Sequence, residues 1–461
     1  MPLILGTNSI KDTGYDVANS LRFNSGSSDS LTRSTTAGNR TTWTFSTWFK
    51  RSKLGVLQSI LEHDDANYFR IRITSGDVFE VFDSNGNNTW NWHGVLRDTS
   101  SWYSIILRGD STDGTNNNRL RLYINGTLAS ANTVASISQN YTFSFNQGGT
   151  LQIGKRGSTD YLDGYLAETI LIDGSALAPD QFGEFDEDSG IWKPIDVSGL
   201  TFGTRGFYLD FENSGSLGAD VSGNGNNFTV NNLTSIDQTT DTPTNNFCTA
   251  NPLHTGSGSV SNAPLSDGNL TFTSSQAGSP YPYYFSTFAA SQGKWYAEFK
   301  VTTANSAVIG IGTGAATGFL GAGLYDYAYY YDGTFYNNGG NTGSQSSYTN
   351  GDIISVAMDL DNNKVYVAKN NTWQHSGDPS AGTGGYTITA PASQTGSTAT
   401  GVYHIAYGDA GGGTPAIQGN FGNPPFTISS GNSDGDGYGN FEYAVPSGYY
   451  ALNSKNLAEY G

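Results

Sequence analysis

Several residue classes are scarce in this 461-residue chain, and each shortage excludes a class of function. The single cysteine excludes an internal disulfide framework and a cysteine-based zinc site. The 22 Lys and Arg residues against 40 Asp and Glu give a formal net charge of −18, which opposes nucleic-acid binding because phosphates repel such a surface. No run approaches the roughly 18 consecutive apolar residues of a membrane span, so membrane insertion is not expected. The opening Met1–Gly6 is too short, and lacks the basic start, for a signal peptide.

Glycine and aromatic residues are abundant instead. The chain has 60 Gly, and Phe, Trp and Tyr together make up 13% of it. Charged residues are only 13%, which alone would suit a disordered chain. Disordered chains lack the apolar surface that offsets the entropy of ordering, so this aromatic content predicts a folded protein.

The apolar residues alternate with polar ones, as in strands, and helical periodicity is nearly absent. Thr42–Lys50 mixes β-branched and aromatic residues, and Leu120–Ile124 runs into Asn125–Gly126, a strong hairpin signal. Lys294–Val301 alternates in the same way. We predict an all-β protein with two antiparallel β-sandwich domains of the jelly-roll type, joined by a packed linker.

Composition shifts along the chain suggest where these parts begin and end. The stretch around residues 214–264 is rich in Asn, Ser, Thr and Gly and poor in charge, and we interpret it as the packed linker. The predicted division is an N-terminal docking arm, a first sandwich, a connector and a second sandwich, at residues 1–18, 19–200, 201–264 and 265–461.

The first block resembles the laminin-G-like, concanavalin-A-type lectin and glucanase sandwich. The segments that carry this resemblance are, in order, Trp43–Phe49, Trp102–Leu107, Arg121–Leu128, Leu151–Gly154 and Leu162–Glu168. The second block resembles the B30.2/SPRY-type sandwich through Gly293–Phe299, Ile309–Gly312 and Gly351–Asp359. Both families imply a sandwich that recognises a ligand, and neither implies catalysis.

The whole chain is similar to virion proteins of marine tailed bacteriophages. The similarity rests on the opening Met1–Asn8, on Gly206–Phe211, on Asp241–Phe247 and on the ending Pro446–Asn453. It implies a tail-fibre, head-fibre or capsid-decoration protein on the virion surface, made in the host cytoplasm, with other virion proteins as partners. It also makes a homo-oligomer, a trimer included, an open possibility, although no coiled-coil heptads specify one.

One candidate carbohydrate site is a turn that carries Trp90, Trp92 and His93. Sugars stack their apolar faces on aromatic rings, while Asn and His side chains can bond the hydroxyl groups. The alternative is structural. Trp90 and Trp92 are two residues apart, share one face of a strand, and would then cover the edge of the sandwich.

A second candidate is the densest aromatic stretch, from which we select Tyr327, Tyr330, Tyr331 and Tyr336 as carbohydrate-binding residues. Alternation sends Tyr327 and Tyr331 to one side of a strand and Tyr330 to the other. Tyrosine gives large, rigid contact areas at low entropic cost, as in binding loops. The alternative is a core strand with a ladder of packed Tyr rings.

Two acidic stretches are candidates for metal binding or catalysis. Asp434, Asp436 and Glu442 approach the spacing of a calcium loop, although Asn432 holds its first position and Glu442 comes one residue early. Calcium is therefore a possible cofactor, and no other is expected. Glu184–Asp188 approaches the E-x-D-x-E pattern of retaining glucanases, but it lies in turn-rich sequence, and a solvated loop also explains it.

We therefore expect a virion surface protein without enzymatic activity that binds host-surface glycans weakly and multivalently. Leu3, Ile4 and Leu5 have no amphipathic context of their own, and we expect them to dock on the particle. The main alternative is a purely structural capsid or tail subunit. A polysaccharide depolymerase and a secreted adhesin are further alternatives, the latter requiring an export signal that the sequence does not show.

Overall fold

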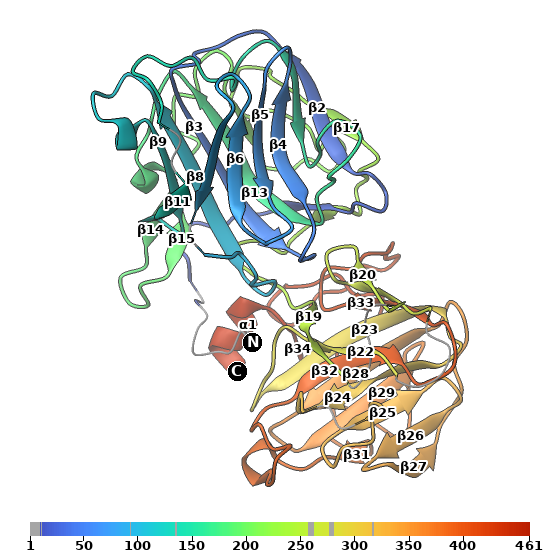
Figure 1. The fold of residues 1–461 in the computed structure, drawn as a ribbon. Coiled ribbons are helices and arrows are strands. Elements are labelled where there is room, and N and C mark those ends of the chain that lie inside the picture. Colours follow the sequence, from blue (N-terminus) through green and yellow to red (C-terminus); the bar gives the residue numbers. More distant parts are fainter. Residues whose placement is uncertain are drawn as a thin grey trace. The chain divides into compact units, whose positions relative to one another are not determined.

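The computed structural model describes residues 10, 12–92, 94–133, 136–256, 262–275, 281–315 and 318–461. The chain forms two compact units, one spanning Thr13–Asn245 and the other built on Asn246–Gly461. Almost all regular structure in the described residues is β-strand, with one α-helix, α1 (Ser454–Tyr460), at the C-terminal end (Figure 1). The all-β prediction is confirmed. The described residues include no helix that is long and apolar enough to cross a membrane.

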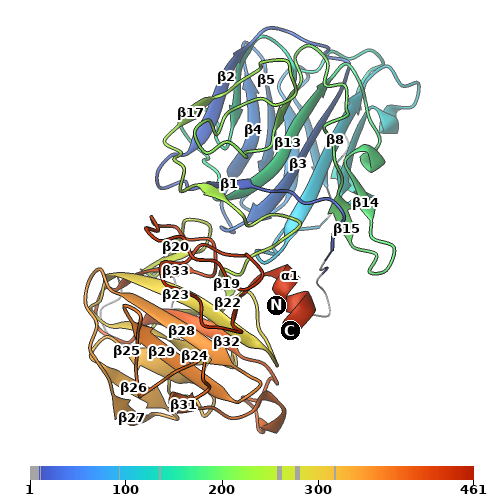
Figure 2. The same ribbon diagram turned by 180° about the vertical axis from the view of Figure 1, so that it is seen from behind.

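Two large antiparallel sheets build the first unit (Figure 2). The sheet around β3, called the β3 sheet, has the order β10 (Thr127–Leu128), β9 (Leu120–Ile124), β8 (Trp102–Asp110), β3 (Thr42–Arg51), β13 (Gly164–Asp173), β1 (Ser20–Phe23) and β18 (Gln238–Thr239), with β16 (Phe207–Leu209) also paired to β13. The other, the β5 sheet, has the order β11 (Ala131–Thr133), β7 (Asn88–Trp92), β6 (Phe79–Asp83), β5 (Tyr68–Ile73), β4 (Gln58–Asp64), β12 (Gly149–Ile153), β2 (Ser30–Thr35) and β17 (Thr229–Asn231).

The two sheets of the first unit differ in what covers their faces. Between them lies a core that includes Trp43, Phe45, Phe69 and Ile71, all with no exposed surface. A second apolar cluster, with Trp48, Trp102 and Tyr165, covers the opposite face of the β3 sheet. Strand β3 is therefore buried on both faces, whereas β5 of the other sheet alternates strictly between buried and half-buried residues.

Short elements complete the first unit. The hairpin of β14 (Gly183–Phe185) and β15 (Trp192–Pro194) follows a 3₁₀ turn at Pro179–Gln181, and another such turn lies at Asn116–Asn118. Four strands come from the stretch that we interpreted as a connector at 201–264. Strands β16, β17 and β18 pair with β13, β2 and β1 of the first unit, whereas β19 (Ala250–Thr255) belongs to the second unit. The division between the units lies at 245/246, so most of that stretch is an integral part of the first sandwich.

The second unit also contains two sheets. One, the β24 sheet, has the order β19 (Ala250–Thr255), β22 (Tyr283–Ser286), β32 (His404–Asp409), β24 (Ala307–Gly312), β25 (Tyr327–Tyr330), β26 (Thr334–Asn337) and β27 (Gly340–Ser344). The other, the β23 sheet, has the order β20 (Leu265–Ser266), β21 (Thr271–Thr273), β33 (Ala416–Asn420), β23 (Lys294–Thr303), β28 (Ile353–Asp359), β29 (Lys364–Lys369) and β30 (Thr372–Trp373), with β31 (Tyr386–Thr387) paired to β29 and β34 (Tyr450–Ala451) parallel to β23. A 3₁₀ turn lies at Pro391–Ser393.

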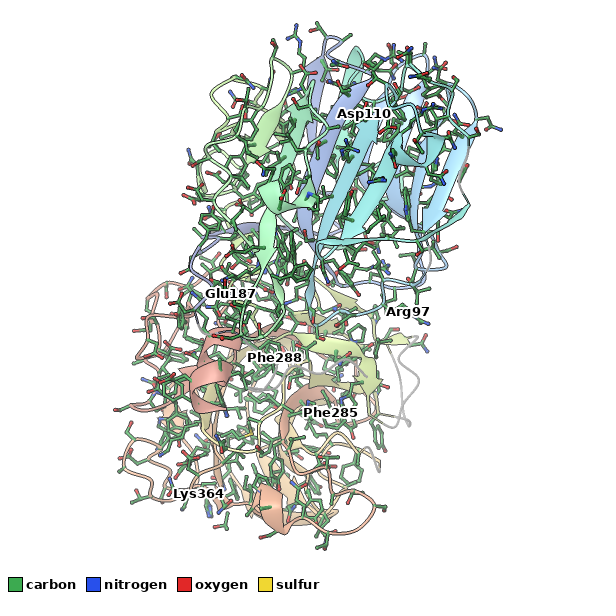
Figure 3. The ribbon with its side chains drawn as sticks, turned by 90° about the vertical axis from the view of Figure 1, so that its left-hand side faces the viewer. Arg97, Asp110, Glu187, Phe285, Phe288 and Lys364 are labelled. Atoms are coloured by element: carbon green, nitrogen blue, oxygen red, sulfur yellow. The ribbon has the colours of Figure 1, made fainter. Side chains whose placement is uncertain are left out.

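Neighbouring residues of β22 belong to different apolar clusters of the second unit, Tyr284 to one and Phe285 to another. Phe288 belongs to the cluster that includes Trp295, Phe299 and Val356, whereas Phe285 belongs to a smaller cluster with Tyr283 and other residues of the β24 sheet. Both phenylalanines have no exposed surface, and Lys364 reaches outward at the periphery of the same unit (Figure 3). The β24 sheet thus has packed side chains on both faces.

Candidate functional site

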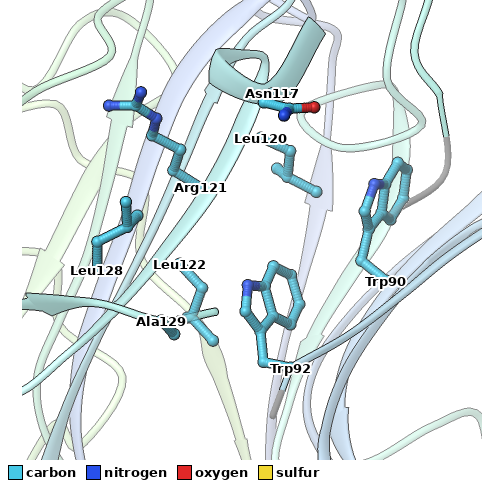
Figure 4. Close-up of a pocket in the computed structure, with 8 residues that line it drawn as sticks. All are labelled: Trp90, Trp92, Asn117, Leu120, Arg121, Leu122, Leu128 and Ala129. Atoms are coloured by element: carbon cyan, nitrogen blue, oxygen red, sulfur yellow. The ribbon is translucent and has the colours of Figure 1, made fainter. Parts of the chain in front are cut away.

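A pocket of about 330 Å³ lies in the first unit, where β7 of one sheet and β9 and β10 of the other line it (Figure 4). Trp90, Trp92 and Leu122 are its buried walls, and Leu128 is 51% exposed. The volume is at the small end of the range of about 300–1,000 Å³ for ligand pockets. The lining residues are Trp90, Trp92, Asn117, Leu120, Arg121, Leu122, Leu128 and Ala129.

The two tryptophans that line this pocket have a mainly structural role. Trp90 is 1% exposed and Trp92 is 3% exposed, and both belong to the core between the sheets. The sequence spacing places them on one face, and that face is the buried one. Rings with so little free surface offer no stacking platform to a sugar, so the pocket is a weak candidate. His93 lies outside the described residues.

The selected tyrosines separate as the alternation predicts. Tyr327 is packed in the main core of the second unit and Tyr331 packs against it, whereas Tyr330 lies on the other face of the sheet. Tyr330 and Tyr336 come together, with ring centroids 4.6 Å apart, and Phe319 adds a third ring. Tyr327 is 5% exposed and Tyr330 7% exposed, so packing accounts for these two rings.

The acidic residues of the proposed calcium loop have separate partners. Both carboxylate oxygens of Asp434 are occupied, because Oδ1 accepts from the backbone N–H groups of Asp436 and Tyr438 and Oδ2 from Ala451 and Asn456. Asp436 accepts from the Tyr460 hydroxyl, and Glu442 from Ser429. Within the described residues no group of three or more His, Cys, Asp or Glu side chains could hold a metal ion. The loop is a hydrogen-bonded turn.

The glucanase-like acidic stretch begins on β14 and continues into the turn of the hairpin. Asp186 accepts from the side chain and backbone of Ser189 and pairs with Lys193, and these bonds lower the pKa of Asp186 to about 2. A carboxylate held ionised in this way is a poor general acid. Leu3, Ile4 and Leu5 lie outside the described residues, so their docking role stays a prediction.

The face of the β5 sheet that points away from the core carries a different arrangement. Cross-strand pairs share a face of a sheet, and the register pairs Arg70 with Glu62 on one side and with Phe82 on the other. In a second row Arg72 lies opposite Glu80. Tyr68 is the third residue of β5 on this face, since the intervening residues are buried. We call Glu62, Tyr68, Arg70, Arg72, Glu80 and Phe82 the Arg–Glu face.

Two ion pairs fix the arginines of the Arg–Glu face. Arg70 Nε donates to Glu62 Oε1 at 2.6 Å, and Arg72 pairs with Glu80. Burial raises the pKa of Glu62, while its bond with Arg70 opposes that change. The second oxygen of Glu62 accepts from the Gly157 N–H. Each arginine is thus held by its partner in one position, which reduces the entropy that binding would cost.

The arginines of the Arg–Glu face keep hydrogen-bonding capacity for a ligand. Among the described residues, Arg70 donates no hydrogen bond besides the one from Nε, so its terminal nitrogens Nη1 and Nη2 are open. Its side chain is 17% exposed and that of Arg72 is 20% exposed. These are planar donors of fixed orientation, and the hydroxyl oxygens of a sugar can accept hydrogen bonds from them.

Aromatic rings lie beside these donors. The Tyr68 and Phe82 rings are stacked with centroids 5.6 Å apart, and the Arg70 guanidinium lies 3.8 Å from the Tyr68 centroid. Both rings are half-buried, so each keeps some free surface. The residues of the Arg–Glu face were not among the candidate sites predicted from the sequence. The signal was available, because every second residue of Tyr68–Ile73 is polar or aromatic and must face away from the core.

Comparison with known families agrees with this architecture. Residues 24–181 match the model of the concanavalin A-like lectin/glucanases superfamily. The first unit has the concanavalin A-like lectin fold. The resemblance expected from the sequence is confirmed to that extent. None of the curated proteins matches the chain.

Several solved structures are similar to parts of the chain at low identity. The chain is similar to the SPRY domain of human HERC1 (15% identity, 37% of this chain and 96% of that chain, TM-score 0.28). It is also similar to a putative carbohydrate binding protein from Bacteroides ovatus (17% identity, 47% of this chain and 59% of that chain, TM-score 0.35). A third is the heptameric SAP-like pentraxin from Limulus polyphemus (16% identity, 36% and 81%, TM-score 0.28).

Proposed function

We propose that this protein binds neutral glycans through the Arg–Glu face of its first unit. The observation that carries the proposal is the Arg70–Glu62 pair, which holds open guanidinium donors beside the stacked Tyr68 and Phe82 rings. Fixed planar donors next to aromatic surface suit a ligand with hydroxyl groups around an apolar ring. The net charge of −18 disfavours anionic polysaccharides.

The proposal includes a place on a virion surface, as the sequence similarity to phage proteins implies. Many copies on one particle would convert weak single sites into firm attachment, since linking sites raises binding by roughly 10²–10⁴-fold. A homo-oligomer, a trimer included, would serve the same purpose. The protein is proposed to act by binding alone, without catalysis. A purely structural subunit is the alternative outcome of the tests below.

The replacement Arg70→Lys tests the Arg–Glu face. Lysine can still pair with Glu62, which is 2% exposed, but it lacks the planar fork and the stack on Tyr68. Losing a charge-assisted hydrogen bond costs about 1.5–3 kcal/mol, so we expect binding to host polysaccharide to weaken by roughly 10–100-fold. Affinity electrophoresis or a glycan array measures it.

A matched control for this test is Arg108→Lys. Arg108 lies on β8 of the other sheet, forms an ion pair with Asp110, and is as exposed as Arg72, at 20%. We expect this variant to bind like the parent protein, with both variants melting at similar temperatures. Equal binding by Arg70→Lys and the parent would contradict the proposed site, and no binding of any glycan by the parent would favour the structural subunit.

Removing residues 2–9 tests the docking arm. This deletion takes away Leu3, Ile4 and Leu5 but spares Tyr15 and Val17, which pack against the first unit. We expect a folded protein that binds glycans normally and fails to join the particle, and quantitative mass spectrometry of purified particles measures its incorporation. Normal incorporation would show that particle attachment depends on another part of the chain.

A further inference from the structure

Three rings in the second unit are stacked in parallel at the surface. Phe335 and Tyr386 have centroids 3.5 Å apart and planes 3° apart, and His375 continues the stack with its centroid 4.5 Å from that of Tyr386, at 12°. Phe335 has no exposed surface and Tyr386 is buried, whereas His375 is exposed. The imidazole is therefore the last ring of the stack, and only one of its faces is covered by Tyr386.

The backbone holds His375 in this place despite an unfavourable conformation. His375 and Ser376 both have φ of +50°, in the left-handed region that residues other than glycine adopt infrequently. The His375 N–H donates to Gln345 Oε1 at 3.0 Å, and its carbonyl accepts from Gly385. Such conformations persist where the surroundings determine them, and they concentrate at binding sites.

Backbone hydrogen bonds place neutral polar residues close to His375. The bond from His375 to Gln345 places segment 344–347 beside the stack, and Gln374 Oε1 accepts from the Ser346 N–H. Ser346 and Ser376 are exposed. Gly343 lies against Tyr386, since a Cβ there would come 3.3 Å from the Tyr386 hydroxyl. The stack thus ends in a flat, exposed ring beside segments that carry Gln345, Ser346 and Ser376, while Lys364 donates to the Gly384 carbonyl on the segment that leads to Tyr386.

We infer that His375 is a stacking platform for a neutral sugar ring, a second glycan site on the second unit. The inference rests on the proposed function for its ligand class, but its residues are independent of the Arg–Glu face. A pyranose would place its apolar C–H face on the imidazole, with the serine and glutamine groups bonding its hydroxyls. Each chain would then be bivalent, which raises avidity without new contacts.

The test uses the full chain labelled with ¹³C-histidine and titrated with methyl glucoside, methyl galactoside and a neutral trisaccharide. Of the five histidines, His63, His254 and His404 are buried, and a His93→Gln variant assigns the remaining signal. We expect saturable shifts of the His375 imidazole signals. We expect His375→Trp to bind at least threefold more tightly, because a larger ring stacks over more area, and His375→Ala to lose this binding.

Two further results separate this inference from the proposed function. In the Arg70→Lys variant the shifts at His375 should remain, since the two sites share no residue. Loss of binding in Arg70→Lys with no shift at His375 for any sugar would overturn the platform alone. Shifts at His375 with no effect of Arg70→Lys would overturn the Arg–Glu face and leave the platform standing. Unchanged sugar affinity in both His375→Ala and His375→Trp would also overturn the stacking platform at His375.

Discussion

Replacing Asp241 with alanine is expected to lower the free energy of unfolding of the first unit by about 3–5 kcal/mol. Asp241 Oδ2 lies 2.7 Å from Lys50 Nζ, and both side chains are 1% exposed. Oδ1 accepts from Trp102 Nε1 at 3.1 Å. Without Asp241 the buried ammonium group of Lys50 loses this carboxylate, and the weaker compensation of a desolvated charge is the source of the loss.

Calorimetry of the full chain measures this effect on the transition of the first unit. For a unit of this size, each kcal/mol lowers Tm by about 2–4 °C, so a fall of roughly 6–20 °C is expected. The double replacement Lys50→Met with Asp241→Leu should recover most of it, because it leaves no charge buried. Glu184→Ala is the surface control, since Glu184 is 59% exposed, and it should cost less than about 1 kcal/mol. If Asp241→Ala and Glu184→Ala lowered the free energy of unfolding equally, the buried ion pair would not be what stabilises this region.

The position of this ion pair shows a limit of sequence analysis. Lys50 lies in a strand whose alternation was recognised from Thr42–Lys50, and alternation assigns one face to the core and the other to water. In the β3 sheet both faces are covered, so Lys50 is buried. The residues that cover the second face, such as Phe182 and Val197, come from distant parts of the chain, and no local sequence pattern predicts this contact.

The candidate sites show a related limit. The sequence predicted the strands and which residues share a face, as with Trp90 and Trp92, but not which face meets solvent. The candidate sites were chosen where aromatic residues are dense in the sequence. In the structure, most of these rings are packed in the apolar clusters. The Arg–Glu face joins residues from three strands, with Glu62, Arg70 and Phe82 brought together by the register of β4, β5 and β6. The His375 stack combines β26, β31 and a turn, and it likewise depends on tertiary pairing.

Glu168 is expected to make the stability of the first unit depend on pH. It lies in a bulge of β13, with φ of +48°, at the point where the partner strand changes from β1 to β16. Its side chain is buried, and Tyr208 donates a hydrogen bond to its Oε2 at 2.7 Å. Burial raises the pKa of Glu168 to about 8 from the ordinary 4.5, and the Tyr208 bond offsets only part of this shift.

The direction of the pH effect follows from proton binding. Between about pH 4.5 and 8 the folded state keeps a proton on Glu168 that the unfolded state has lost, so stability falls as pH rises through this range. The shift corresponds to a loss of stability on the order of 5 kcal/mol from this group, complete above the folded pKa. Below the unfolded pKa the contribution is fully present.

Glu168→Gln removes the titration while keeping the shape and an oxygen that accepts from Tyr208. Urea unfolding across the pH range should show the variant gaining stability over the parent protein as pH rises, with the two similar near the acidic end. The exposed Glu184→Gln serves as the control and should follow the parent at every pH. Parallel curves for Glu168→Gln and the parent would mean that Glu168 is already ionised in the folded protein. In that case, the bulge would have to be stabilising a buried negative charge through Tyr208.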